Sequence, residues 1–170
     1  SGAMDRLLRE VRDDASIKGV ILRIDSPGGD GIASDDIMFD VTELSKRKPV
    51  VISMSDVAAS GGYFIAMNGS PIVAYPNTLT GSIGVYLTRP NLRGFYDKIG
   101  LQKEILSRGK YARIDSEYAP PTPEETEKLR QEVEVFYRAF VSRVARGRNR
   151  PYEQVEPLAQ GRVWLGSQAK

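Results

Sequence analysis

The sequence predicts an α/β protein built around a parallel β-sheet, and three observations support this fold class. Short apolar runs of strand length, such as residues 50–54, alternate with segments whose apolar residues recur at helical spacing. Glycines or other small residues follow the first two runs. The chain has 170 residues, which fits one ordinary domain with a real core. Strands that alternate with helices are typical of parallel sheets with right-handed crossovers.

The first half of the chain alternates helix and strand. Leu7, Leu8 and Val11 are spaced as one face of an amphipathic helix. The apolar run that follows ends in Ser-Pro-Gly-Gly, which predicts a buried strand entering a tight turn. The expected elements are a helix over residues 5–14, a strand over 19–25, a helix over 34–46, a strand over 50–54, a strand-to-helix passage over 55–69 and a strand over 71–75.

The second half is dominated by one long helix. Thr122 is its expected N-cap, Pro123 its first residue, and Glu124 and Glu125 fall in its first turn, where acidic side chains are favoured. The expected elements are a continuation of the strand pattern over 81–86, a helix over 92–99, a strand over 103–107, an irregular loop over 108–121, the long helix over 123–148 and a last helix over 151–158.

Composition excludes several kinds of chemistry. The chain has no histidine and no cysteine, so it cannot form a Ser-His-Asp triad, an HExxH zinc site or a thiolate nucleophile by itself. Its net charge of +2 gives no field that would recruit nucleic acid, and no run of about 18 apolar residues predicts a membrane span. We expect no cofactor and no metal, and any acid–base chemistry must use Lys, Asp, Glu or Tyr.

The ends of the sequence suggest a piece of a larger protein. Residues 1–4 resemble a remnant of an expression tag rather than native sequence. Residues 5–170 are expected to form a single domain that belongs to a longer protein.

The residues with the clearest chemical meaning surround Ser60. This serine is flanked by alanines and by Gly61 and Gly62 at a strand-to-helix junction, so its hydroxyl can protrude and a substrate can approach the backbone closely. Gly28 and Gly29 follow the preceding strand, which in a parallel sheet places them at the same carboxyl edge as Ser60. Two such turns can direct N–H groups at a developing oxyanion. Neither GxGxxG nor GxxxxGK[ST] occurs, which excludes the common phosphate loops.

A nucleophilic Ser60 needs a base, and the absence of histidine leaves a lysine amine as the plausible one. Burial lowers the pKa of a lysine amine toward the useful range. The residues therefore predict a serine/lysine pair, if the protein is a hydrolase.

Four blocks together resemble the signal peptide peptidase A (protease IV) family. They are RIDSPGG (23–29), SDVAASGGYFIA (55–66), AYPNTLTGSIGV (74–85) and GRVWLGSQA (161–169), in the family's order. The resemblance implies a ClpP/crotonase-like fold of repeated ββα units with an added C-terminal helical segment. It implies that Ser60 is the nucleophile, that Gly29 and Gly61 supply the oxyanion N–H groups, and that Ser82 helps to hold the lysine.

The same resemblance implies a biological setting. The substrates would be remnants of cleaved signal peptides and other short apolar peptides, and the enzyme would be a homo-oligomer. The parent protein would be bacterial and anchored in the inner membrane, with its catalytic domain outside the cytoplasm.

The sequence departs from the family at the base. Single-domain members carry the lysine in a Gly-x-x-Lys turn, and the matching turn here, Gly109-Lys110-Tyr111-Ala112, has alanine at that position. Three explanations remain open. Another domain or subunit supplies the lysine, as in double-length members of the family; Lys110 reaches Ser60 instead; or the site is inactive.

Two other functions stay open from the sequence. A crotonase-type acyl-CoA enzyme would use similar oxyanion turns with a carboxylate base, and a non-catalytic assembly domain would keep the fold without the pair of catalytic residues.

Several further residues invite functional interpretations, but structural roles are the better predictions. Asp25 is expected to cap the Ser-Pro-Gly-Gly turn, and Asp35, Asp36 and Asp40 to be a solvated helix start rather than a metal site. The remaining expectations are that Tyr63 lines a cleft or packs, that Trp164 packs or contacts another subunit, and that Arg143, Arg146, Arg148 and Arg150 form a solvated helix end.

Overall fold

The computed structural model describes residues 2–169, which fall into two compact units. The first unit contains the described residues up to Val85 and those from Tyr137 onward, and the second is Tyr86–Phe136. The prediction of a single domain over residues 5–170 stays a prediction.

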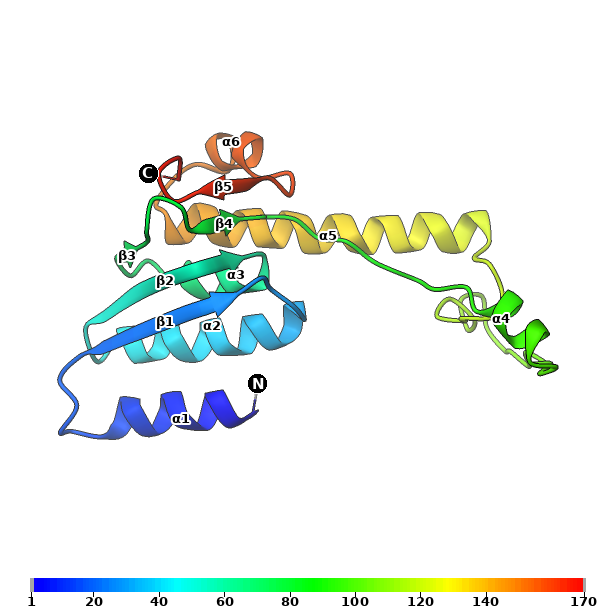
Figure 1. Cartoon of the computed structure of the whole chain (residues 1–170), viewed down its shortest axis with the longest axis horizontal. Helices are drawn as coiled ribbons and strands as arrows, with labels where there is room; N and C mark the ends of the chain where they lie inside the picture. Colours follow the sequence, from blue (N-terminus) through cyan, green and yellow to red (C-terminus); the bar gives the residue numbers. More distant parts are fainter. Residues whose placement is uncertain (1, 170) are drawn as a thin grey trace. The chain divides into compact units, whose positions relative to one another are not determined.

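A five-stranded sheet organises the first unit (Figure 1). Its order is β1-β2-β4-β5, with β3 also paired to β2, and β1, β3 and β4 all run parallel to β2. The predicted parallel α/β arrangement is therefore confirmed. β5 pairs antiparallel with β4 and comes from the C-terminal segment, where no strand was predicted. The strands are β1 (Val20–Ser26), β2 (Val50–Ala59), β3 (Ile72–Val73), β4 (Leu79–Gly81) and β5 (Val163–Leu165).

Helices supply most of the core that packs against this sheet. Leu8 of α1, Leu44 of α2, Ile52 of β2 and Val141 of α5 are all buried in one apolar cluster. This cluster fixes the strands whose ends form the candidate site. The helices of the first unit are α1 (Gly2–Asp13), α2 (Gly31–Ser45), α3 (Gly61–Ala66), α6 (Tyr152–Val155), the 3₁₀ helix η1 (Glu156–Leu158) and the last part of α5 (Pro123–Gly147).

The two strands β1 and β2 pair with an irregularity near their carboxyl ends. Ile24 lies opposite Met54, but Ser26 lies opposite Ala58. Two steps along β1 therefore match four steps along β2, so β2 bulges by two residues. The predicted strand over 50–54 misses the second half of β2, because polar Ser55 and Asp56 interrupt the apolar run at this bulge.

The second unit, Tyr86–Phe136, contains α4 (Arg93–Lys98) and the first part of α5. The predicted strand over residues 103–107 is wrong, because these residues form no helix or strand. No described strand pairs with this segment, and the side chain of Leu106 is 88% exposed. Lys103 instead pairs with Glu117 and contacts the hydroxyl of Tyr96.

The start of α5 agrees with the prediction and forms a reciprocal cap. The Glu125 backbone N–H donates to Thr122 Oγ1 at 3.1 Å, and the Thr122 N–H donates to Glu125 Oε2 at 2.7 Å. The Glu125 side chain is buried and pairs with Arg113 at 3.4 Å. The hydrogen bond from the Thr122 backbone is the largest of the effects that lower the Glu125 pKa, and Arg113 adds to it.

This cap should make the start of α5 sensitive to acid. The pKa of Glu125 is lower in the folded state, so its stabilising contribution is complete above the ordinary glutamate pKa and is lost as pH falls through the lowered value. Glu125→Gln should remove that pH dependence and increase amide exchange at residues 124–126. The measurement is hydrogen exchange of both proteins at neutral and acidic pH, with exposed Glu132→Gln as control. Equal acid sensitivity in the wild type and Glu125→Gln would contradict the prediction.

Candidate active site

Ser60 lies at the junction of β2 and α3 in an unusual backbone conformation. Its φ is 51° and its ψ is −120°, which is the conformation glycine usually provides at the first central position of a type II′ turn. A serine that precedes a helix normally caps it with its hydroxyl, but the Ser60 side chain makes no capping hydrogen bond. The strained turn therefore leaves the hydroxyl uncommitted to its own helix.

The Ser-Pro-Gly-Gly turn after β1 lies directly beside Ser60. A Cβ atom placed on Gly28 would come within 2.7 Å of Ser60 Cβ and 2.8 Å of the Gly61 backbone nitrogen. A Cβ on Gly61 would lie 3.1 Å from the Gly29 nitrogen. The structure thus brings together the two glycine turns that the sequence placed on one sheet edge.

Both predicted oxyanion donors have amides suited to that role. Among the described residues, the Gly29 N–H has no hydrogen-bond acceptor. Gly61 is the first residue of α3, so its N–H has no acceptor within the helix. Because α3 has only six residues, its helix dipole is weak. An anion beside Ser60 would be stabilised mainly by hydrogen bonds from these two N–H groups.

The loop that contains Ser82 supports Ser60 from the side of β4. The Ser60 N–H donates to the Gly81 carbonyl at 2.9 Å, and the Ser82 N–H donates to the Arg162 carbonyl at 2.6 Å. Ser82 also has a positive φ of 50°, which is uncommon for a serine. Two strained serines on adjacent strand ends are therefore held by backbone hydrogen bonds.

The described lysines of the first unit lie at the other end of the sheet. Lys18 and Lys48 flank the amino ends of β1 and β2, and Lys46 ends α2. Lys18 donates to the Ala15 carbonyl at 2.7 Å, Lys46 pairs with Glu43, and Lys48 donates to the Val11 carbonyl at 2.6 Å. Ser60 follows the carboxyl end of the ten-residue β2, about 33 Å along the strand. None of these three lysine amines therefore lies where it could accept the proton of Ser60.

Lys110, the predicted alternative base, has a local environment that opposes this role. It lies in a turn with Ala112, whose N–H donates to the Gly109 carbonyl at 3.3 Å. Its amine is mostly exposed and pairs with Glu124 at 3.2 Å. The hydrogen bond and charge of Glu124 raise the pKa of Lys110 above its ordinary value, so less of the amine is available to accept a proton.

Asp25 does not cap the Ser-Pro-Gly-Gly turn, which corrects the prediction. Its Oδ1 instead accepts the Val57 N–H of β2 at 3.3 Å. The turn is capped by Ser26, whose hydroxyl accepts the Gly28 N–H at 3.2 Å. β2 bulges opposite Asp25, which leaves the Val57 N–H within reach of the Asp25 carboxylate.

The acidic residues of α2 form no metal site. Among the described residues, no group of three or more His, Cys, Asp or Glu side chains could hold an ion. Asp35 pairs with Arg143, and Asp40 is buried and pairs with Arg9 at 3.3 Å, so Asp40 is not solvated as predicted. The helix also begins earlier than predicted, because Asp30 caps it by accepting the Ala33 N–H at 2.8 Å.

Tyr63 and Trp164 both have packing roles. Tyr63 is buried, and its hydroxyl accepts a hydrogen bond from Arg148 Nε at 3.2 Å. Trp164 Nε1 donates to the Leu158 carbonyl at 3.0 Å, and a Cβ on Gly81 would lie 2.7 Å from its ring. These contacts brace α3 and β4 on either side of Ser60.

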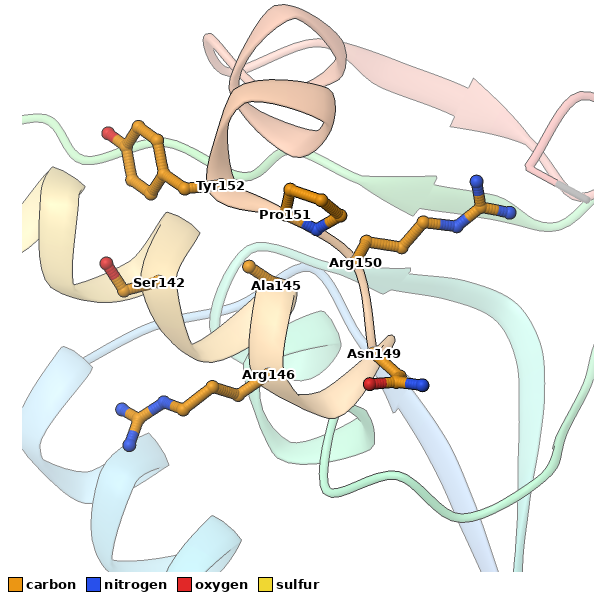
Figure 2. A pocket seen from close by; sticks show the side chains of 7 residues that line it. All are labelled: Ser142, Ala145, Arg146, Asn149, Arg150, Pro151 and Tyr152. Carbon is orange, nitrogen blue, oxygen red and sulfur yellow. The ribbon is translucent and has the colours of Figure 1, made fainter.

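The arginines at and beyond the end of α5 make separate contacts. Arg143 and Arg148 stack over Phe64 and Tyr63 at 5.4 and 5.7 Å, so these two are not merely solvated. Arg146 and Arg150 line a hollow of about 630 Å³. Figure 2 shows that their side chains point in different directions. None of the predicted site residues lines this hollow.

The fold defines the class of protein first. ClpP1 from Listeria monocytogenes, in a mutant form, superposes with a TM-score of 0.64 over 99% of this chain and 77% of that chain, at 15% sequence identity. The ClpP/crotonase-like fold predicted from the sequence is therefore confirmed. Peptidase family S49 matches residues 42–170, and the chain belongs to this family of serine peptidases.

Two curated relatives agree with this family. The chain is 48% identical to the chloroplastic serine protease SPPA of Arabidopsis thaliana over 163 residues, which cover 95% of this chain and 24% of that protein. It is 41% identical to Protease 4 of Haemophilus influenzae over 165 residues, or 96% of this chain and 27% of that protein. The chain therefore spans about a quarter of the length of these relatives. Since one of them is a plant protein, bacterial origin stays a prediction.

Proposed function

We propose that this chain carries the nucleophile of a serine/lysine peptidase, with Ser60 as the attacking residue. The observation that carries the proposal is the strained backbone of Ser60. The Ser60 hydroxyl does not cap α3, and the residue packs against Gly28. Strain of this kind costs about 1–3 kcal/mol and is found most often at functional sites. A serine that served only as a turn residue would have no reason to retain it.

The proposed reaction follows the ordinary course of acyl transfer. Ser60 Oγ attacks the scissile carbonyl carbon while its proton passes to a lysine amine, and the new oxyanion accepts the Gly29 and Gly61 N–H groups. The C–N bond then breaks, the protonated lysine returns the proton to the leaving amine, and water releases the acyl group. Ser82 is proposed to orient the lysine, since its backbone is fixed one residue beyond the Gly81 contact to Ser60.

The lysine is proposed to come from another domain or subunit. Ala112 occupies the position where the family pattern has lysine, and the pKa of Lys110 is raised. The described lysines of the unit that contains Ser60 lie near the far ends of its strands. The greater length of the relatives leaves room for a second segment that would provide the base.

Cleaved signal peptides and other short apolar peptides are the proposed substrates. A relative from Enterococcus faecium, 34% identical over 163 residues, is named as a putative signal peptide peptidase SppA, which supports this substrate class. A homo-oligomer in the cell envelope, with a parent protein anchored in the inner membrane, completes the proposal. Among the described residues, no helix is both long and apolar enough to cross a bilayer.

The two alternative functions differ in support. The comparisons favour a peptidase over an acyl-CoA enzyme, because the matched family and the two relatives described above are peptidases. A non-catalytic assembly domain is favoured by Ala112, and covalent labelling of Ser60 distinguishes it from the peptidase.

If the base is a missing amine, a free amine in solution should partly replace it. We expect ethylamine to accelerate labelling of Ser60 by a fluorophosphonate about 10-fold or more, in proportion to its unprotonated concentration, since general bases contribute about 10²–10⁴-fold. The measurement is the rate of Ser60 phosphonylation by mass spectrometry. Tetraethylammonium at the same ionic strength is the control, because it cannot accept a proton.

The same assay tests Lys110. Lys110→Ala should change neither the slow basal rate nor the response to ethylamine. Fast labelling of the wild type at neutral pH without ethylamine would contradict a base supplied by a segment outside this chain. If Lys110→Ala then abolished it, Lys110 would be the base.

A further inference from the structure

The two-residue bulge in β2 determines which residue of the Ser-Pro-Gly-Gly turn meets Ser60. Before the bulge Ile24 pairs with Met54, and after it Ser26 pairs with Ala58. Continuing the later register by two residues places Gly28 opposite Ser60, and the 2.7 Å approach of a Gly28 Cβ to Ser60 Cβ agrees with this. Without the bulge, the earlier register would place Gly28 opposite Ala58.

Side chains of β1 and of Thr78, the residue before β4, hold the bulged segment Ser55–Val57. The Ser55 hydroxyl accepts a hydrogen bond from Arg23 Nη2 at 2.6 Å, and the Ser55 carbonyl accepts one from Thr78 Oγ1 at 2.7 Å. These contacts fix the beginning of the bulge. Its end, three residues before Ser60, is fixed from β1 by the Asp25 carboxylate, which accepts the Val57 N–H at 3.3 Å.

Asp25 is the residue of β1 that spans the bulge, because its neighbours Ile24 and Ser26 pair with Met54 and Ala58 on either side. A backbone N–H in a bulge lacks its ladder partner, so a side-chain acceptor or water takes its place. Oδ1 of Asp25 does this for Val57. Asp56, in the middle of the same bulge, is exposed and makes no such contact among the described residues.

We propose that Asp25 is a positioning residue for the active site, which holds the β2 bulge so that Ser60 stands opposite Gly28. This rests on the proposed function of Ser60 as nucleophile. The role requires a hydrogen-bond acceptor and not a negative charge. Asparagine should therefore replace Asp25, whereas alanine should not.

The test compares Asp25→Ala, Asp25→Asn and the matched control Asp56→Ala in the full chain. The rate of fluorophosphonate labelling at Ser60 should fall about 10- to 100-fold in Asp25→Ala, as expected for a small misplacement of the nucleophile. It should stay within about 3-fold of the wild type in the other two variants. The melting temperature of each variant is measured in parallel, and labelling is done well below it.

Two results would overturn the proposal. Labelling of Asp25→Ala at the wild-type rate would mean that the bulge holds its register without Asp25. An Asp25→Asn rate as low as that of Asp25→Ala would mean that the charge acts, rather than the acceptor.

A second measurement separates this inference from the proposed function. If wild-type Ser60 is not labelled at all, the nucleophile proposal fails, and hydrogen exchange of the Val57 amide still reports on Asp25. Faster exchange of the Val57 amide in Asp25→Ala, but not in Asp25→Asn, supports the proposal that the Asp25 side chain holds the bulge. Unchanged exchange in both variants overturns it.

Discussion

Replacing Ser60 by alanine should reduce fluorophosphonate labelling of the chain to background, and replacing it by glycine should do the same while making the fold more stable. Labelling forms a bond between Ser60 Oγ and phosphorus as fluoride leaves, so neither variant can react at this position. The difference in stability follows from the backbone. Ser60 has a φ of 51° and a ψ of −120°, where glycine is unstrained and alanine is as strained as serine.

The expected gain for Ser60→Gly is about 1 kcal/mol in the free energy of unfolding. Relief of about 1–3 kcal/mol of strain is partly offset by about 0.5–1 kcal/mol of backbone entropy that glycine loses on folding. Denaturant unfolding of the wild type and both variants measures this gain. Asn149→Gly is the control, because Asn149 has a φ of 49° but asparagine tolerates that region, so its change should be smaller.

A loss of stability in Ser60→Gly would show that the turn is not strained, and the main argument for Ser60 as nucleophile would then fall. Persistent labelling in Ser60→Ala would identify another nucleophile. The two variants therefore test the strain and the chemistry separately.

The neighbours of Ser60 could be predicted from the sequence because parallel strands bring their carboxyl ends to one edge. Two apolar runs, each followed by a glycine pair, sufficed to place Gly28 and Gly29 beside Ser60 and Gly61. The catalytic roles of these residues stay predictions. The source of the base also stays a proposal, since Ala112 occupies the position where the family pattern has lysine.

Features that depend on pairing between distant segments were missed. The bulge held by Asp25 has no local signal, because a carboxylate after a strand equally predicts a turn cap. β5 has three residues, which are too few to show a periodic pattern. Its extended conformation depends on its pairing with β4. The start of α2 had a usable signal, because Asp30 is a favoured N-cap residue.

The absence of a side chain at Gly28 is as important to the candidate site as the hydroxyl of Ser60. With a φ of 114°, Gly28 has a backbone conformation that other residues rarely adopt, and a Cβ there would lie 2.7 Å from Ser60 Cβ and 2.8 Å from the Gly61 nitrogen. Backbone atoms of a strained turn cannot move aside cheaply. The Ser-Pro-Gly-Gly turn itself must then shift away from Ser60 and carry the Gly29 N–H with it.

Gly28→Ala is therefore expected to lower the rate of Ser60 labelling by about 100-fold or more and the free energy of unfolding by about 1–3 kcal/mol. The labelling rate, measured below the melting temperature of the variant, separates displacement of the site from unfolding. Gly31→Ala is the matched control three residues away, because a Cβ on Gly31 meets no atom within 4 Å. Wild-type labelling by folded Gly28→Ala would mean that the Ser-Pro-Gly-Gly turn does not form one wall of the reactive site.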